Sequence, residues 1–171
     1  MKKIQANLLL ILSLIVCLSC EKDDICVDGN TPLLVIEFYD FDTLGEDEET
    51  LKAVPSLRIG GDGHEFTVNT IADRTSLDMV ELPLKADATA TTFHFIVNSA
   101  TENNVEIGNT DIITFNYNAK EVFVSRACGF VMNYNNLTEE LQVDADNWIK
   151  NITISETLIE TQAITHVKIF H

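Results

Sequence analysis

The densest group of side chains that could do chemistry is an acidic loop of residues 40–49. Asp40, Asp42 and Glu46 offer carboxylate oxygens, the ligands that Ca²⁺ prefers. The loop begins like an EF-hand, but Leu44 takes a ligand position and Leu51 stands where the bidentate glutamate belongs. A run of charges between two strands is more often simply solvated. We therefore expect no metal here and keep the three carboxylates as weak candidates.

His64 is the other weak metal candidate, because Asp62 and Glu65 lie close to it in the sequence. The glycines at positions 60, 61 and 63 more simply predict a tight connection between two strands. His64 and the acidic loop together support one alternative function, a metal-dependent glycan binder or hydrolase. That alternative requires a pocket in which these groups converge.

No catalytic constellation emerges from the remaining residues. Cys128 would need a histidine partner to act as a nucleophile, and no motif places one beside it. We expect no catalytic residues, no enzymatic activity and no cofactor other than a covalent lipid.

The start of the chain has the layout of an export signal. Lys2 and Lys3 precede a short apolar run over residues 8–16, which leads to Ser19 and Cys20. A membrane-spanning helix needs about 20 apolar residues, roughly twice this run. The segment is therefore interpreted as a signal peptide over residues 1–19.

The segment 17–20, Cys-Leu-Ser-Cys, resembles the lipobox of bacterial lipoproteins. The resemblance implies that Cys20 receives a diacylglycerol before cleavage; an ordinary cleaved signal without lipid is the alternative. Lys22, Asp23 and Asp24 resemble the signal that sends Bacteroidota lipoproteins to the cell surface. Residues 20–30 would then be a lipidated acidic tether on the outer membrane, with the periplasmic face as the other possibility.

The lipobox leaves two cysteines in the folded domain, Cys26 and Cys128. Outside the cytoplasm two cysteines suggest one disulfide, although two buried thiols or a reactive Cys128 stay open.

The net charge restricts the partners. The chain has 27 acidic and 11 basic residues, and without Lys2 and Lys3 its formal charge is −18. Such a surface repels phosphate groups, so we expect no nucleic-acid binding and a membrane attachment made by lipid alone.

Short runs rich in β-branched and aromatic residues fill the chain from residue 31 onward. Alternation is clearest at Phe93, Phe95 and Val97. We predict one all-β domain over residues 31–171, an antiparallel β-sandwich of immunoglobulin-like type. Asn118 and Ala119 suggest a hairpin turn within residues 111–126, and residues 137–146 suggest a helical turn. The predicted strands are 33–39, 56–59, 65–69, 80–84, 91–98, 111–117, 122–126, 130–134, 148–155 and 164–170.

Two further resemblances bear on function. Asp42-Thr43-Leu44 resembles the O-glycosylation motif of exported Bacteroidota proteins, which makes Thr43 a candidate glycan site. Five parts of the chain together resemble an uncharacterised family of short flavobacterial lipoproteins. They are Cys26, the segments 31–40, 127–130 and 147–149, and the ending 166–171. That resemblance implies an outer-membrane β-barrel protein as a partner and brings no activity with it. We therefore expect a non-enzymatic binding or structural module of the cell envelope.

Overall fold

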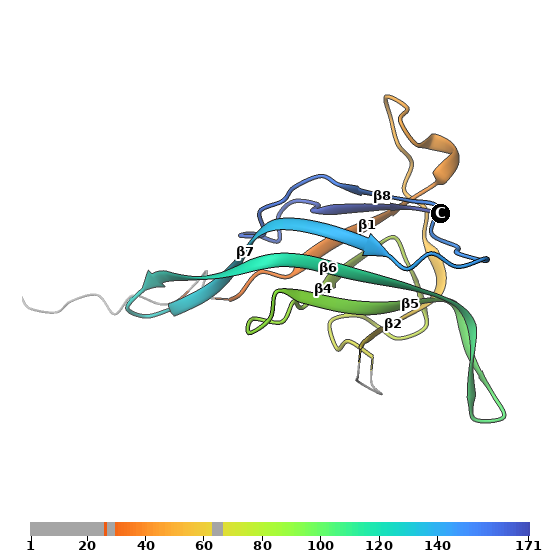
Figure 1. The fold of residues 1–171 in the computed structure, drawn as a ribbon, viewed down its shortest axis with the longest axis horizontal. Coiled ribbons are helices and arrows are strands. Elements are labelled where there is room, and N and C mark those ends of the chain that lie inside the picture. Colours follow the sequence, from red (N-terminus) through yellow and green to blue (C-terminus); the bar gives the residue numbers. More distant parts are fainter. Residues whose placement is uncertain (1–25, 27–29, 63–66) are drawn as a thin grey trace, which may run out of the picture.

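The computed structural model describes residue 26, residues 30–62 and residues 67–171. In this part of the chain two sheets pack face to face, which confirms the predicted β-sandwich (Figure 1). The elements in chain order are β1 (Leu34–Tyr39), the 3-10 helix η1 (Phe41–Thr43), β2 (Val54–Gly61), β3 (Thr75–Leu77), β4 (Met79–Leu82), β5 (Ala90–Glu102), β6 (Val105–Ser125), β7 (Gly129–Leu141), β8 (Asn151–Ile154) and β9 (Val167–Phe170).

The smaller sheet has the strand order β4-β1-β9-β8, and the larger sheet has the order β3-β2-β5-β6-β7. All neighbours are antiparallel except β1 and β9, the first and last strands, which pair in parallel. In an immunoglobulin constant domain the first strand lies at a sheet edge beside the second. Here β1 lies between β4 and β9, so the strand order differs from that of an immunoglobulin constant domain.

The core forms where the alternating residues of the two sheets meet. Phe93, Phe95 and Val97 on β5 are buried, as their alternation predicted, and Phe115 on β6 is buried beside them. Phe38 of the smaller sheet meets Phe95 of the larger one edge to face, with ring centroids 6.5 Å apart. Aromatic contacts therefore join the two sheets across the sandwich.

The hairpin predicted within residues 111–126 is wrong, because β6 runs unbroken through Asn118 and Ala119. The register shifts there: Asn116 pairs with Thr138, whereas Asn118 pairs with Asn135. Asn136, between these two partners, has φ of 56°. The polar residues at this shift form a β-bulge, which bends the paired strands without ending β6.

The helical turn predicted over residues 137–146 is also wrong. Residues 137–141 complete β7, where Leu137 is buried and Leu141 pairs with Ile113 of β6. Pairing with a long neighbouring strand overrides the local preference of Thr138 and the glutamates that follow it. No helix among the described residues is long and apolar enough to cross a membrane.

Several predicted segments lie outside the described residues. These are the signal peptide, the tether positions Cys20, Lys22, Asp23 and Asp24, the candidate ligand His64 and part of the predicted strand 65–69. The described Thr67 forms an isolated bridge with Gly60.

The ends of the sandwich carry different structures. The β6–β7 hairpin projects beyond the other strands at one end, and the acidic loop lies near the C-terminus at the other end (Figure 1). The candidate sites are therefore well separated.

Candidate functional site

The acidic loop starts where β1 ends, and Asp40 shapes its first turn. The Asp40 carboxylate accepts a hydrogen bond from the backbone N–H of Asp42 at 3.3 Å and so caps η1. The Thr43 hydroxyl donates to the Asp40 carbonyl at 2.9 Å and accepts from the backbone N–H of Thr50 at 3.1 Å. These bonds hold the two sides of the loop together. Attachment of a glycan to Thr43 would remove the donated bond.

Two lysines fasten the loop to the sandwich. Lys52 Nζ lies 3.0 Å from Asp40 Oδ1 and also donates to the His171 carbonyl at 3.1 Å. Lys168 Nζ lies 2.6 Å from Glu49 Oε2 and 4.9 Å from the centre of the Tyr39 ring. The hydrogen bond from Lys52 lowers the pKa of Asp40, and the one from Lys168 lowers the pKa of Glu49. Both carboxylates are thus ionised and form ion pairs within the protein.

This arrangement engages one of the three described metal candidates, Asp40, in an ion pair. Asp40 faces Lys52, while Asp42 and Glu46 are exposed on the loop. Within residues 30–62 and 67–171, no group of three or more histidine, cysteine or acidic side chains is placed to hold a metal ion.

Apolar side chains are exposed on the same loop and just after it, a feature that the sequence analysis missed. Phe41 is 42% exposed, Leu44 is 40% exposed and Leu51 is 48% exposed. Grouped apolar residues rimmed by charge are typical of protein interaction sites. The sequence contained this signal, because Phe41, Leu44 and Leu51 stand among or beside the charged residues of the loop.

The other end of the sandwich holds the predicted disulfide. Cys26 and Cys128 are bonded, with their Cα atoms 4.9 Å apart and a sequence separation of 102. Cys128 lies in the turn of the β6–β7 hairpin, where its backbone N–H donates to the Ser125 hydroxyl at 3.0 Å. The Thr31 hydroxyl accepts a hydrogen bond from the backbone N–H of Met132 at 3.1 Å. The start of the domain is thus held along β7.

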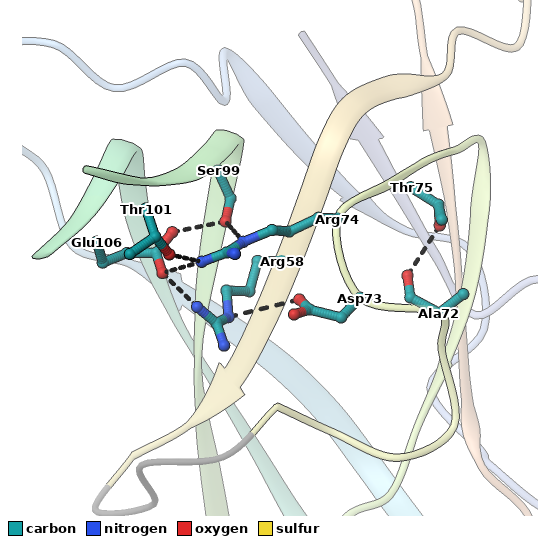
Figure 2. A network of polar contacts seen from close by, with 8 residues as sticks. All are labelled: Arg58, Ala72, Asp73, Arg74, Thr75, Ser99, Thr101 and Glu106. Atoms are coloured by element: carbon teal, nitrogen blue, oxygen red, sulfur yellow. Dashed lines mark hydrogen bonds and ion pairs between the residues drawn. The ribbon is translucent and has the colours of Figure 1, made fainter. Parts of the chain in front are cut away.

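A third polar cluster joins β2 to the β5–β6 hairpin. Figure 2 shows Arg58 and Arg74 converging on Glu106, with Arg74 Nη2 2.8 Å from Glu106 Oε2. Arg74 Nε donates to the Ser99 hydroxyl at 2.9 Å, and Arg58 Nε lies 3.4 Å from Asp73 Oδ1. Burial opposes ionisation of Glu106, but the hydrogen bonds from Ser99 and the two arginines outweigh it and lower its pKa. Two cations and two anions balance here, so the cluster serves to hold the hairpin in place.

Asp111 is the most buried carboxylate that the structure describes. It lies on β6 with no exposed surface, and its Oδ2 accepts a hydrogen bond from the backbone N–H of Ile149 at 2.8 Å. Burial raises the pKa of Asp111. Trp148, beside Ile149, donates its indole N–H to the Phe95 carbonyl at 3.2 Å. Asp111 therefore fixes the segment before β8 against the larger sheet.

An open groove lies between β2 and the connection from β4 to β5. Lys85 is the one ionisable side chain among its described lining residues, so these provide no acid–base pair. The described lining residues are Gly61, Thr67, Val68, Asn69, Pro83, Leu84, Lys85, Thr91 and Phe93.

The chain was compared with curated proteins, solved structures and models of protein families, and only a family model matches. Neither the curated proteins nor the solved structures contain a match to this chain. A family model matches residues 56–171, from β2 to the last residue. This confirms the resemblance to an uncharacterised family, while the flavobacterial lipoprotein part of that resemblance stays a prediction. The chain belongs to the family of unknown function DUF6452.

Proposed function

We propose that this protein is a lipid-anchored, non-enzymatic binding module of the bacterial outer membrane. Its attachment point is Cys20, its surface signal is Lys22, Asp23 and Asp24, and its contact with a partner is the acidic loop. The observation that carries the proposal is the position of that loop, which lies at the opposite end of the sandwich from the Cys26–Cys128 bridge (Figure 1). A domain tethered at one end presents the other end to a partner.

The composition of the loop defines the chemistry of that partner. Glu46, Asp47 and Glu48 are exposed, and Phe41 and Leu44 are exposed beside them. A basic surface with an apolar centre complements such a loop. The family resemblance drawn from the sequence favours an outer-membrane β-barrel protein as the source of that surface.

The fastening of the loop also supports binding. Its backbone is held by Asp40 and Thr43, and its base is held by Lys52 and Lys168. A binding surface that is already ordered loses less conformational freedom when a partner docks. The exposed acidic and apolar side chains therefore lie on a loop whose backbone is already ordered before a partner binds.

Site-specific photocrosslinking in intact cells tests this proposal. A photoreactive residue in place of Leu44 should give a discrete crosslinked product with an envelope protein. The same residue in place of Thr138, exposed on β7, is the positional control and should give none. Equal crosslinking from both positions would contradict a specific contact through the loop.

Charge reversal sharpens the test. The triple variant Glu46→Lys, Asp47→Lys and Glu48→Lys should abolish the Leu44 crosslink, because it inverts the charge of the proposed contact. The matched control carries Asp87→Lys, Glu140→Lys and Glu160→Lys, three exposed sites away from the loop, with the same change in net charge. Loss of the crosslink in both variants would point to a non-specific effect of charge.

The alternative function, a metal-dependent glycan binder or hydrolase, has less support because Asp40 already contacts Lys52. It predicts that Ca²⁺ raises the melting temperature of the purified domain. The binding-module proposal predicts no such shift, and a shift that disappears in Asp42→Asn would favour the alternative.

A further inference from the structure

The end of the β6–β7 hairpin exposes aromatic side chains. Here the hairpin tip means residues 122–131, the last residues of β6, the turn and the first residues of β7. Phe123 and Phe130 pair directly across the strands, and their ring centroids are 5.3 Å apart. Phe123 is 56% exposed, Phe130 is 60% exposed and the adjacent Val124 is 39% exposed. Exposed aromatics grouped at a projecting tip indicate a contact surface.

The charge of this region differs from that of the whole chain. Residues 122–138 contain no aspartate or glutamate, although 27 of the 171 residues in the chain are acidic. Arg126, in the turn, is the one charged residue of the segment, and it is exposed. A negative membrane surface would repel most of this protein but not the hairpin tip.

The disulfide fixes the tip close to the proposed lipid. Cys128 is in the turn itself, and its partner Cys26 follows Cys20 by six residues. Six residues span at most about 20 Å when fully extended. A lipid on Cys20 therefore keeps Cys26 within that distance of the bilayer and the turn only one disulfide further away, while the acidic loop lies at the far end (Figure 1).

We propose that the hairpin tip inserts Phe123 and Phe130 into the interfacial region of the bilayer that holds the lipid. This inference rests on the proposed lipidation of Cys20. Aromatic side chains are favoured at the boundary between headgroups and acyl chains, and Arg126 can remain among the headgroups. The lipid and the hairpin tip form two attachment points, which orient the sandwich with its acidic loop away from the membrane. A single lipid would leave that orientation free.

Depth-dependent fluorescence quenching tests the inference on the mature, lipidated protein. Phe130→Trp is reconstituted into vesicles of phosphatidylcholine and phosphatidylglycerol, with and without brominated phosphatidylcholine. The wild-type signal, which comes from Trp148, is subtracted. We expect brominated lipid to quench more than half of the added emission. Leu44→Trp in the acidic loop is the control and should not be quenched.

A second variant keeps the test independent of the fold. Adding Phe123→Asp to Phe130→Trp should remove most of the quenching while the circular dichroism spectrum stays unchanged, because Phe123 is largely exposed. Quenching equal to that of Leu44→Trp in protein whose mass includes the lipid would overturn the inference and leave the proposed anchor standing.

Two other outcomes would also overturn it. A Phe130→Trp signal that changes with protein concentration and not with brominated lipid would assign the tip to contact with a second copy of the chain. A mature protein with no lipid mass on Cys20 would overturn the proposed function together with this inference.

Discussion

The two ends of the sandwich are fastened by different forces. At the hairpin tip, the covalent bond between Cys26 and Cys128 holds the start of the domain. At the acidic loop, ion pairs from Lys52 and Lys168 and a few hydrogen bonds hold the chain. The hairpin tip contains no acidic residue, whereas the acidic loop is dominated by them. The proposed function uses this difference, with attachment at the covalent end and recognition at the ionic end.

The largest effect is expected from Cys20→Ala, which removes the proposed attachment point. This variant should lose all incorporation of radiolabelled fatty acid and should accumulate as uncleaved precursor. Cys17→Ala is the matched control and should retain the label. Labelled Cys20→Ala would refute the anchor and with it the contrast between an attached end and a free end.

The next largest effect is expected from breaking the disulfide. For a loop of about 100 residues, the chain-entropy model gives a loss of up to about 4.7 kcal/mol in the free energy of unfolding. Cys26→Ser, Cys128→Ser and the double variant should therefore be destabilised equally in urea titrations of the mature domain. Reduction of the wild-type protein should have the same effect. Two free thiols in unreduced, denatured wild-type protein would show that the covalent end is not cross-linked.

Asp111, between the two ends, should give an intermediate effect. Asp111→Ala leaves the backbone N–H of Ile149 without its acceptor, at a cost of about 1–3 kcal/mol in the free energy of unfolding. Asp111→Asn keeps an acceptor and is the control. Equal loss in both variants would mean that the ionised carboxylate itself is needed.

The pH dependence offers a second measurement at Asp111. Burial raises the pKa of Asp111, so the folded protein holds this proton more tightly than the unfolded chain. The free energy of unfolding should therefore fall as the pH rises from the ordinary aspartate pKa to the raised one. Asp111→Asn should lack this decline relative to wild type, and parallel curves for the two proteins would contradict the assignment.

The smallest effect is expected at the ionic end. Lys168→Met removes the partner of Glu49 and should lower the free energy of unfolding by at most about 1 kcal/mol, less in high salt. The pair lowers the pKa of Glu49, so its contribution is present at neutral pH and is lost as the pH falls through the lowered pKa. Lys120→Met, at an exposed site on β6, is the control. A loss as large as that from breaking the disulfide would remove the contrast between the two ends.

The strands with strict alternation were predictable because burial on one face imposes a period of two. Phe93, Phe95 and Val97 show this pattern, and the structure confirms β5 around them. The errors came where local signals conflict with long-range pairing. Asn118 suggested a turn, yet Asn135 pairs with it across the sheet, and Leu137 belongs to the same ladder. No short sequence window contains the partner strand that decides these cases.

The features of the candidate sites also divide into those that the sequence predicted and those that depend on long-range contacts. The Cys26–Cys128 bridge followed from counting cysteines, because the resemblance to a lipobox leaves only these two to pair. The fastening of the acidic loop could not be predicted, since Lys168 is far from Glu49 in sequence and meets it only through the pairing of β1 with β9. The exposed aromatics of the hairpin tip also escaped notice. Phe123 and Phe130 look like ordinary strand residues until the hairpin is seen to project beyond the sandwich.

The position of the disulfide also determines how the domain bears a mechanical load. A pull on the chain before Cys26 passes through the sulfur–sulfur bond into the turn between β6 and β7. The force then runs along β6 and β7 together, and the ladder that it shears is the long one between β6 and its other neighbour, β5. Without the bridge, the same pull would act first on the short strand β1. The disulfide would thus keep a pull on the proposed tether from separating β1, the strand that leads into the acidic loop, from its sheet.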